Sequence, residues 1–214
     1  MSVTRRGFRG YDTDFRMCVR RSIGKMGVLR QAGLPEVRVV DPENVVIELA
    51  IGYQENTMNY IVAVGDMKIG MNSDVLVTHA LGSCLGLMVY DPVARVGGLL
   101  HAMLPLSKIN PQKASENPYM FVDTGVPELF RQLYEIGGQK GRMVVKAAGC
   151  GQPLGNSEIF KIGERNYTVL KKLLWKNNLL LEAEDVGGVV SRTVYFDLSN
   201  GQVLVSSKGV KTEL

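Results

Sequence analysis

The sequence predicts an α+β fold, a layered α/β sandwich of mixed and antiparallel sheets with about two helices on one side. One observation is the number of short apolar segments bounded by Gly, Pro, Asn or Asp, which is typical of β-strands joined by turns. Another is that apolar residues recur at helical spacing only around residues 126–134 and 164–176. Because several strands form hairpins, we expect helices on one side of sheets whose other faces pack together.

Each element has its own signals in the sequence. Strands are expected at residues 45–51, 60–64, 75–78, 143–148, 179–181, 193–197 and 202–205. Asn200-Gly201 predicts a two-residue hairpin loop before the last strand. The first helix should begin after a cap at Asp123 or Thr124 and end at Gly137-Gly138, and the second should run from about Glu164 to Lys176. The expected inward residues are Val126, Leu129, Phe130, Leu133 and Tyr134 in the first helix, and Tyr167, Leu170, Leu173 and Leu174 in the second.

The charge pattern indicates a basic N-terminal extension at residues 1–45 and one domain at residues 46–214. The chain has 214 residues and a formal net charge of +4, and its first 30 residues contain eight Lys or Arg and two Asp. A solvated leader is the simpler interpretation, and binding to nucleic acid or to an acidic membrane is the alternative. We expect no nucleic-acid partner, because no aromatic interleaving or nucleic-acid fold signature accompanies this charge.

The composition indicates a cytoplasmic protein without membrane insertion. No apolar run approaches the roughly 18 residues that a membrane-spanning helix needs, and the arginine-rich beginning contains no signal-peptide core. The cysteines, Cys18, Cys84 and Cys150, are odd in number and widely spaced, which fits a reducing compartment. No two of them have metal-ligand spacing, and the only histidines are His79 and His101, so we expect no metal and no cofactor.

The segment at residues 81–105 places a cysteine and a histidine on two neighbouring strands. An apolar run that begins around Cys84 is followed by a short loop and by a second apolar run with His101, which predicts a β-hairpin. If Tyr90 pairs with Arg95, Cys84 lies directly opposite His101. Residues in such a pair point to the same face, with Cβ atoms about 4.5–5.5 Å apart. A slip of one residue would place them on opposite faces.

Cys84 and His101 have the chemistry of a nucleophile and its base. A free thiol with a pKa of about 8.5 supplies little thiolate at neutral pH, so an imidazole that takes its proton raises its reactivity. His101 could later return that proton to a leaving group. Thr78, at the end of the preceding strand, could accept a hydrogen bond from the other ring nitrogen. Backbone N–H groups of Gly82 and Ser83 could stabilise an oxyanion.

The same residues also have purely structural interpretations. Cys84 could be a packing cysteine and His101 a hydrogen-bonded core histidine, since apolar residues flank both. His79 competes with His101 as the base, but it should point to the opposite face of its strand from Thr78. Residues 149–155 superficially resemble a dinucleotide-binding glycine pattern, yet the third glycine comes one position late. We expect this segment to be a tight turn beside the site, with Cys150 as inert packing.

The chain also resembles the chemoreceptor glutamine deamidase family, CheD, over residues 58–208. The motifs that carry the resemblance are Thr78, Gly82-Ser83-Cys84-Leu85-Gly86 with Tyr90-Asp91, Gly97 to Pro105, Tyr119 to Pro127, Ile162 to Asn166, Ala183 to Gly188 and Asp197 to Val205. The resemblance implies catalytic positions at Cys84, His101 and Thr78. It also implies a fold similar to the deamidase domains of cytotoxic necrotizing toxins. Residues 149–151 depart from the family's usual Gly-Gly-Ala turn. We expect this departure to change local contacts with the substrate and not the chemistry.

The function that the resemblance implies is protein-glutamine deamidation. Glutamines on the cytoplasmic helices of chemoreceptors become glutamates, ammonia is released, and no cofactor is involved. The resemblance also implies binding to a CheC-type phosphatase as a second partner. Two alternatives stay open at this point. One is a non-catalytic adaptor that binds and stimulates a CheC-type phosphatase, and the other is a thiol esterase or protease of more general specificity.

Overall fold

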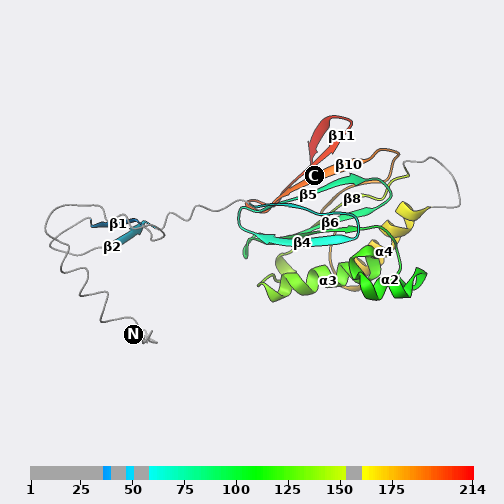
Figure 1. Ribbon diagram of the computed structural model, residues 1–214, viewed down its shortest axis with the longest axis horizontal. Helices are drawn as coiled ribbons and strands as arrows, with labels where there is room; N and C mark the ends of the chain where they lie inside the picture. Colours follow the sequence, from blue (N-terminus) through cyan, green and yellow to red (C-terminus); the bar gives the residue numbers. More distant parts are fainter. Residues whose placement is uncertain (1–35, 40–46, 51–57, 153–160) are drawn as a thin grey trace. The chain divides into compact units, whose positions relative to one another are not determined.

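The computed structural model describes residues 36–39, 47–50, 58–152 and 161–214 (Figure 1). The chain divides into two compact units, residues 1–54 and 55–214. In the first unit, β1 (Glu36–Val39) pairs antiparallel with β2 (Ile47–Ala50). Cys84, His101 and Thr78 all lie in the second unit. The assignment of residues 1–45 as a basic extension stays a prediction.

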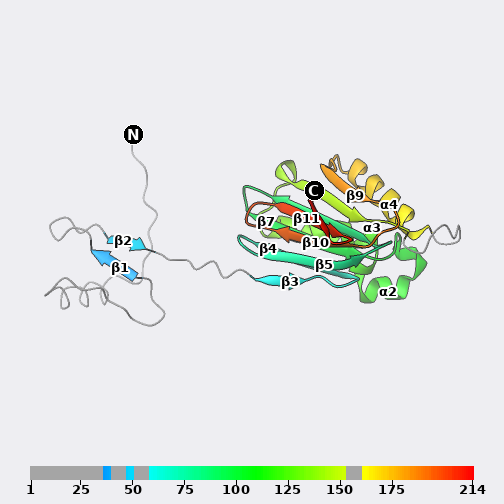
Figure 2. The same cartoon turned by 90° about the horizontal axis from the view of Figure 1, so that it is seen from above.

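The second unit contains two five-stranded sheets. The outer sheet has the order β12-β11-β10-β5-β3, and the central sheet has the order β4-β7-β6-β8-β9. Neighbouring strands are antiparallel except for the parallel pairs β3–β5 and β8–β9. The strands of the stacked sheets run in roughly the same direction (Figure 2). Their bounds are β3 (Asn59–Ile61), β4 (Asp66–Met71), β5 (Val75–Leu81), β6 (Leu85–Asp91), β7 (Val96–Ala102), β8 (Val144–Gly149), β9 (Ala183–Val186), β10 (Arg192–Asp197), β11 (Gln202–Ser207) and β12 (Val210–Glu213).

The central sheet is covered on both faces. Along β6, Leu85, Leu87 and Val89 belong to the core on the helix side, whereas Met88 and Tyr90 belong to the core between the two sheets. Side chains of a strand point alternately to its two faces, so this alternation separates the two cores. The second unit therefore has three layers: helices, central sheet and outer sheet (Figure 1). The predicted α+β fold of mixed and antiparallel sheets is confirmed.

Two helices of about the predicted extent cover the free face of the central sheet. They are α3 (Val122–Glu135) and α4 (Ile162–Lys176), and their buried hydrophobic residues are Val122, Val126, Leu129, Phe130 and Leu133 in α3 and Leu170 and Leu174 in α4. Tyr134 was predicted to face inward but is exposed. The connection before α3 holds η1 (Ser107–Ile109), α2 (Pro111–Glu116) and η2 (Pro118–Met120), and η3 (Lys140–Arg142) precedes β8.

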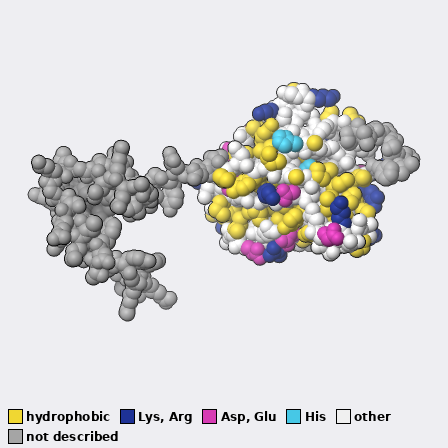
Figure 3. Space-filling model, in the orientation of Figure 1, with side chains coloured by type: hydrophobic (Ala, Val, Ile, Leu, Met, Phe, Trp, Pro, Cys, Tyr) yellow, Lys and Arg dark blue, Asp and Glu magenta, His cyan; other side chains and the backbone are white. Residues whose placement is uncertain are grey.

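Two further observations concern the length of the helices and the distribution of charge on the surface. Within the described ranges, no helix is both long enough and apolar enough to cross a bilayer. Acidic, basic and apolar side chains are interspersed over the face of the second unit that Figure 3 shows.

The start of α3 differs from the prediction. Phe121 is the N-cap and makes no side-chain capping bond, while Asp123 and Thr124 lie in the first helical turn. Their side chains bind the preceding connection instead: Asp123 accepts from the Ser107 backbone N–H at 2.8 Å, and the Thr124 hydroxyl donates to the Pro118 carbonyl at 2.6 Å. The two polar residues therefore tie the segment after β7 to the helix, which a local capping rule does not capture.

Three strand predictions also need correction. Residues 179–181 form no strand; they connect α4 to β9, and Leu180 is exposed. The loop before β11 has four residues, because Asp197 pairs with Gln202. The strands β1, β4, β9 and β12 were not predicted. β4 contains polar residues and a glycine, β9 contains two acidic residues, and every residue of β12 is exposed, so these three lack the apolar run that marks a strand.

Candidate active site

Thr78 and His101 meet in the layer between the two sheets. Thr78 lies in the middle of β5 in the outer sheet, not at its end as predicted, and His101 lies on β7 in the central sheet. The Thr78 hydroxyl is 2.7 Å from Nδ1 of His101 and donates to the Val62 carbonyl at 2.7 Å. A hydroxyl has one proton, so Thr78 accepts a hydrogen bond from Nδ1–H. This arrangement fixes the tautomer and leaves the lone pair on Nε2.

His101 is held neutral by its surroundings. The side chain is fully buried, and burial lowers its pKa to about 4 because a charged imidazolium is poorly solvated there. Its Nε2 is buried and has no hydrogen-bond partner among the described residues. At neutral pH the ring therefore has a free, unprotonated nitrogen available as a base.

Cys84 lies on the same face of the hairpin as His101, although the predicted register was wrong. Tyr90 pairs with Gly97, and Gly86 pairs with His101, so Cys84 is not directly opposite the histidine. The strands extend further toward the loop than assumed, because Asp91 still pairs with Val96. The error is an even number of residues, so the face is unchanged.

The cysteine comes immediately before β6, and its partly buried side chain packs against the core between the sheets. By extrapolation of the pairing, Cys84 is diagonal to His101, a relation that separates residues by roughly 7–8 Å on paired strands. Among the described residues, the Cys84 thiol and the His101 ring form no hydrogen bond with each other. Burial raises the pKa of the Cys84 thiol. Both groups are therefore neutral at rest, and proton transfer must accompany any attack by the sulfur.

All three carbonyls of the Gly82–Cys84 turn are hydrogen-bonded. The Gly82 carbonyl accepts from Gly151 N–H at 2.7 Å, and the Cys84 carbonyl accepts from Cys150 N–H at 2.7 Å. The Ser83 carbonyl accepts from the Asn166 side chain at 3.0 Å. The backbone N–H groups of Ser83 and Cys84 donate to no other described residue. Such a turn has its acceptors fixed and its donors free, as an oxyanion site requires.

The glycine-containing turn after β8 lies beside the Gly82–Cys84 turn, as expected. Gly149 has φ +94°, and a Cβ on it would collide with the Cys84 carbonyl. Cys150 is buried on the helix side of the sheet, and burial raises the pKa of its thiol to about 12. A thiol in this state is not a nucleophile at neutral pH.

Replacement of Gly149 by alanine should destabilise the protein. The change forces a side chain into a left-handed backbone and against the Cys84 carbonyl, so we expect the free energy of unfolding to fall by about 2–4 kcal/mol. Urea denaturation measures this change. Gly141→Ala is the matched control, because a Cβ there meets nothing within 4 Å. Equal midpoints for the two variants would contradict this account of the turn.

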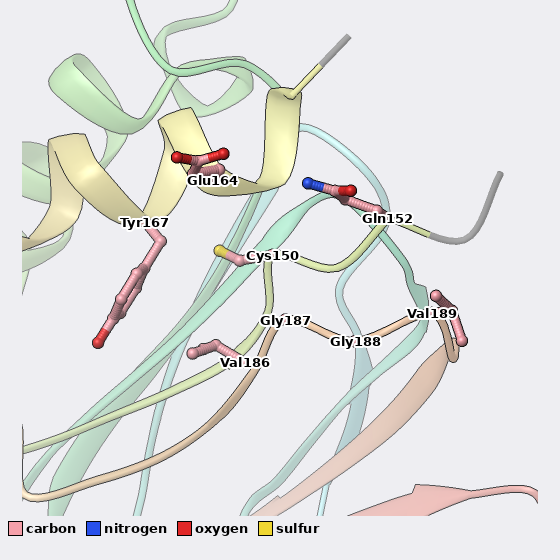
Figure 4. Close-up of a pocket in the computed structure, with 8 residues that line it drawn as sticks. All are labelled: Cys150, Gln152, Glu164, Tyr167, Val186, Gly187, Gly188 and Val189. Carbon is pink, nitrogen blue, oxygen red and sulfur yellow. The ribbon is translucent and has the colours of Figure 1, made fainter. Parts of the chain in front are cut away.

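A pocket of about 500 Å³ lies between α4 and the turn after β8 (Figure 4). Its lining residues are Cys150, Gln152, Glu164, Tyr167, Val186, Gly187, Gly188 and Val189. Tyr167 donates to Glu184 at 2.5 Å; burial and this bond raise its pKa to about 12. Neither Cys84 nor His101 lines this pocket, so it is distinct from the Thr78–His101 site.

Two residues near the site, Val62 and Asn166, were not predicted as site residues. The structure also excludes His79 as the alternative base. The backbone carbonyl of Val62 has no sequence signal, whereas Asn166 does have one, since it is a polar residue on the stripe with Leu170 and Leu174. His79 is exposed, on the opposite face of β5 from Thr78, as predicted. The structure thus brings Thr78 and His101 into contact and places Cys84 in the adjacent turn.

This α+β sandwich contains a buried histidine–threonine pair on two strands and a cysteine in the adjacent turn, which are the residue types that a cysteine hydrolase uses. The chain matches the family model for CheD, described as CheD chemotactic sensory transduction, over residues 103–207. It is 45% identical over 150 residues to the "Probable chemoreceptor glutamine deamidase CheD 1" of Syntrophus aciditrophicus (strain SB), covering 70% of this chain and 94% of that protein.

Other curated relatives agree with this match. The "Probable chemoreceptor glutamine deamidase CheD" of Solibacter usitatus (strain Ellin6076) is 46% identical over 155 residues, covering 72% of this chain and 92% of that protein. The protein of the same name from Pyrococcus horikoshii is 42% identical over 144 residues, covering 66% and 88%. The chain belongs to the CheD family.

Proposed function

We propose that this protein is a chemoreceptor glutamine deamidase that hydrolyses glutamine side chains of receptor proteins to glutamate and ammonia. Membership of the CheD family and the names of its relatives support the substrate class. The observation that carries the chemistry is the Thr78–His101 hydrogen bond, which leaves Nε2 free as a base on the face of the hairpin that also holds Cys84.

The reaction begins with attack of the Cys84 sulfur on the carbon of the glutamine carboxamide. The thiol proton passes to Nε2 of His101 as the C–S bond forms, and the carbonyl oxygen becomes an oxyanion. Backbone N–H groups of Ser83 and Cys84 donate to that oxygen. His101 then gives its proton to the amide nitrogen, the C–N bond breaks, and ammonia leaves.

The remaining thioester is hydrolysed in the second half of the reaction. His101 takes a proton from water, the resulting oxygen nucleophile attacks the thioester, and the C–S bond breaks. The thiol leaves with the proton, and the receptor carries a glutamate. The lowered pKa of His101 suits the step that releases ammonia, because its imidazolium is a stronger acid than an ordinary one.

The test is incubation of the purified protein with cytoplasmic fragments of chemoreceptors. Mass spectrometry should find selected glutamines converted to glutamates, with ammonia in equal amount. Methanol from methylated receptor or peptide-bond cleavage, without this conversion, would instead indicate the general esterase or protease. Absence of conversion, together with binding to a CheC-type phosphatase, would replace the proposal by the adaptor function.

The partners and location follow from this activity. The substrate is the cytoplasmic helical region of the receptor, so the protein acts in the cytoplasm. A recessed thiol has to receive a glutamine that projects from a helix. The segment from Ser107 to Pro118, which follows the His101 strand, is suited to contact the surrounding receptor surface. A CheC-type phosphatase is the second proposed partner, on the family resemblance.

Replacement of Thr78 by valine should slow the reaction without removing it. Valine keeps the shape but leaves Nδ1–H without its acceptor and the Val62 carbonyl without its donor. An unpaired buried group costs about 1–3 kcal/mol, so we expect kcat to fall about 10- to 100-fold. Thr78→Ser retains the hydroxyl and should remain within about threefold of wild type. Equal rates of receptor deamidation in both variants would show that the hydroxyl does not orient the ring.

A further inference from the structure

Asn166 is a buried polar residue of α4 that reaches both strands of the candidate site. Its side chain is fully buried on the helix stripe that also holds Gly163, Leu170 and Leu174. Such a stripe is normally apolar, and an amide placed there destabilises the fold unless its polar atoms are paired. A residue of this kind at this position therefore needs an explanation in its hydrogen bonds.

The amide nitrogen of Asn166 makes two hydrogen bonds to separate backbone segments. Nδ2 donates to the Ser83 carbonyl at 3.0 Å and to the Met103 carbonyl at 3.0 Å. Ser83 immediately precedes Cys84, and Met103 follows His101 by two residues. The two N–H bonds of an amide have fixed directions, so one planar group sets the separation of these two carbonyls.

The strand ladder does not fix this separation by itself. The β6–β7 pairing ends at Leu85 opposite Ala102, so Ser83, Cys84 and Met103 lie beyond the last pair. Neither carbonyl accepts a hydrogen bond from any other residue that the structure describes. Oδ1 of Asn166 is buried without a partner among those residues. The side chain therefore acts at this point through its two donors.

We infer that Asn166 is a positioning residue, which holds the Cys84 turn against the end of β7 so that the thiol can pass its proton to His101. The inference rests on the proposed function and deepens it, since it adds a residue from α4 to the residues of the two sheets. Both hydrogen bonds of Asn166 to the site are to backbone carbonyls, so its effect on the reaction must pass through Cys84 and His101.

A double-variant cycle with His101 tests this coupling. In the wild-type background, Asn166→Ala should lower kcat for receptor deamidation about 30-fold or more, with KM within about threefold. In a His101→Ala background, the same change should lower kcat by less than about threefold, because the proton transfer that it supports is already lost. Equal factors in both backgrounds, measured on folded protein, would show a merely structural role and overturn the inference.

A second variant covers the case in which alanine impairs folding. In Asn166→Asp the ionised carboxylate donates no hydrogen bond, whereas the protonated form donates one. Its kcat relative to wild type should therefore rise as the pH is lowered from 8 to 5. Asn177→Asp is the matched control, because Asn177 lies at the other end of α4 and is exposed. If the pH profile of Asn166→Asp equals that of the control, the inference is wrong.

Failure of the proposed function would be recognised separately. If the wild-type protein converts no receptor glutamine, the activity is wrong, but the rate at which iodoacetamide alkylates Cys84 still reports on the thiol and its base. Mass spectrometry assigns the alkylated cysteine. We expect Asn166→Ala and His101→Ala each to slow this alkylation, and the double variant to be no slower than His101→Ala alone. Multiplied effects would refute the positioning role without reference to any substrate.

Discussion

The Cys84→Ala variant should lose receptor deamidation by a factor of about 10⁴ or more, the largest effect expected for any single substitution. The proposed mechanism has no other nucleophile at this position. Cys150, the other described cysteine, is buried on the helix side, with its pKa raised to about 12. Water activated by His101 alone would have to attack an unactivated amide, without the covalent intermediate that divides the reaction into two easier steps.

Cys150→Ala is the control for this variant, since both changes remove a thiol and leave a methyl side chain in adjoining turns. It should retain wild-type kcat within about threefold, because Cys150 contributes only its backbone N–H to the Cys84 turn. Deamidation is followed by mass spectrometry on the same receptor fragment, and circular dichroism verifies the fold of both variants. Wild-type conversion by Cys84→Ala, or equal losses in the two variants, would exclude Cys84 as the nucleophile.

The sequence could predict those parts of the site that depend on strand periodicity. Alternation along β5 is enough to place His79 on the opposite face of the strand from Thr78. The predicted register of the hairpin was two residues in error, yet Cys84 remained on the same face, because an even shift preserves side-chain direction.

Contacts between elements distant in sequence could not be predicted in this way. The partner of the Thr78 proton is the Val62 carbonyl, and the partner of the Ser83 carbonyl is a side chain of α4. The first depends on the parallel pairing of β3 with β5 and the second on how α4 packs on the central sheet, and periodicity determines neither. The caps expected at Asp123 and Thr124 failed for the same reason, since their side chains bind a neighbouring segment in place of the helix end.

Substitution of His101 by alanine should lower kcat about 10³-fold, because the site loses both the base for the thiol and the acid for ammonia. The raised pKa of the Cys84 thiol makes this loss large: a thiol that already existed as thiolate would need no base. His79→Ala is the matched control, since His79 is exposed on the other face of β5. A wild-type rate in His101→Ala, or a similar loss in His79→Ala, would exclude His101 as the base.

The pH dependence of kcat/KM in the wild-type enzyme is an independent test of His101 as the base. His101 must be unprotonated to act as a base, so its pKa of about 4 predicts that kcat/KM is maintained from pH 7 to pH 5 and is halved near pH 4. An ordinary histidine would give this fall near pH 6.5. The lowered pKa also makes the unfolded chain bind more protons than the folded chain between pH 6.5 and 4, so the free energy of unfolding falls as the pH is lowered through that range. Circular dichroism at each pH separates this loss of folded protein from the loss of activity. A fall in kcat/KM near pH 6.5 in fully folded enzyme would show that the buried His101 ring is not the group that titrates in catalysis.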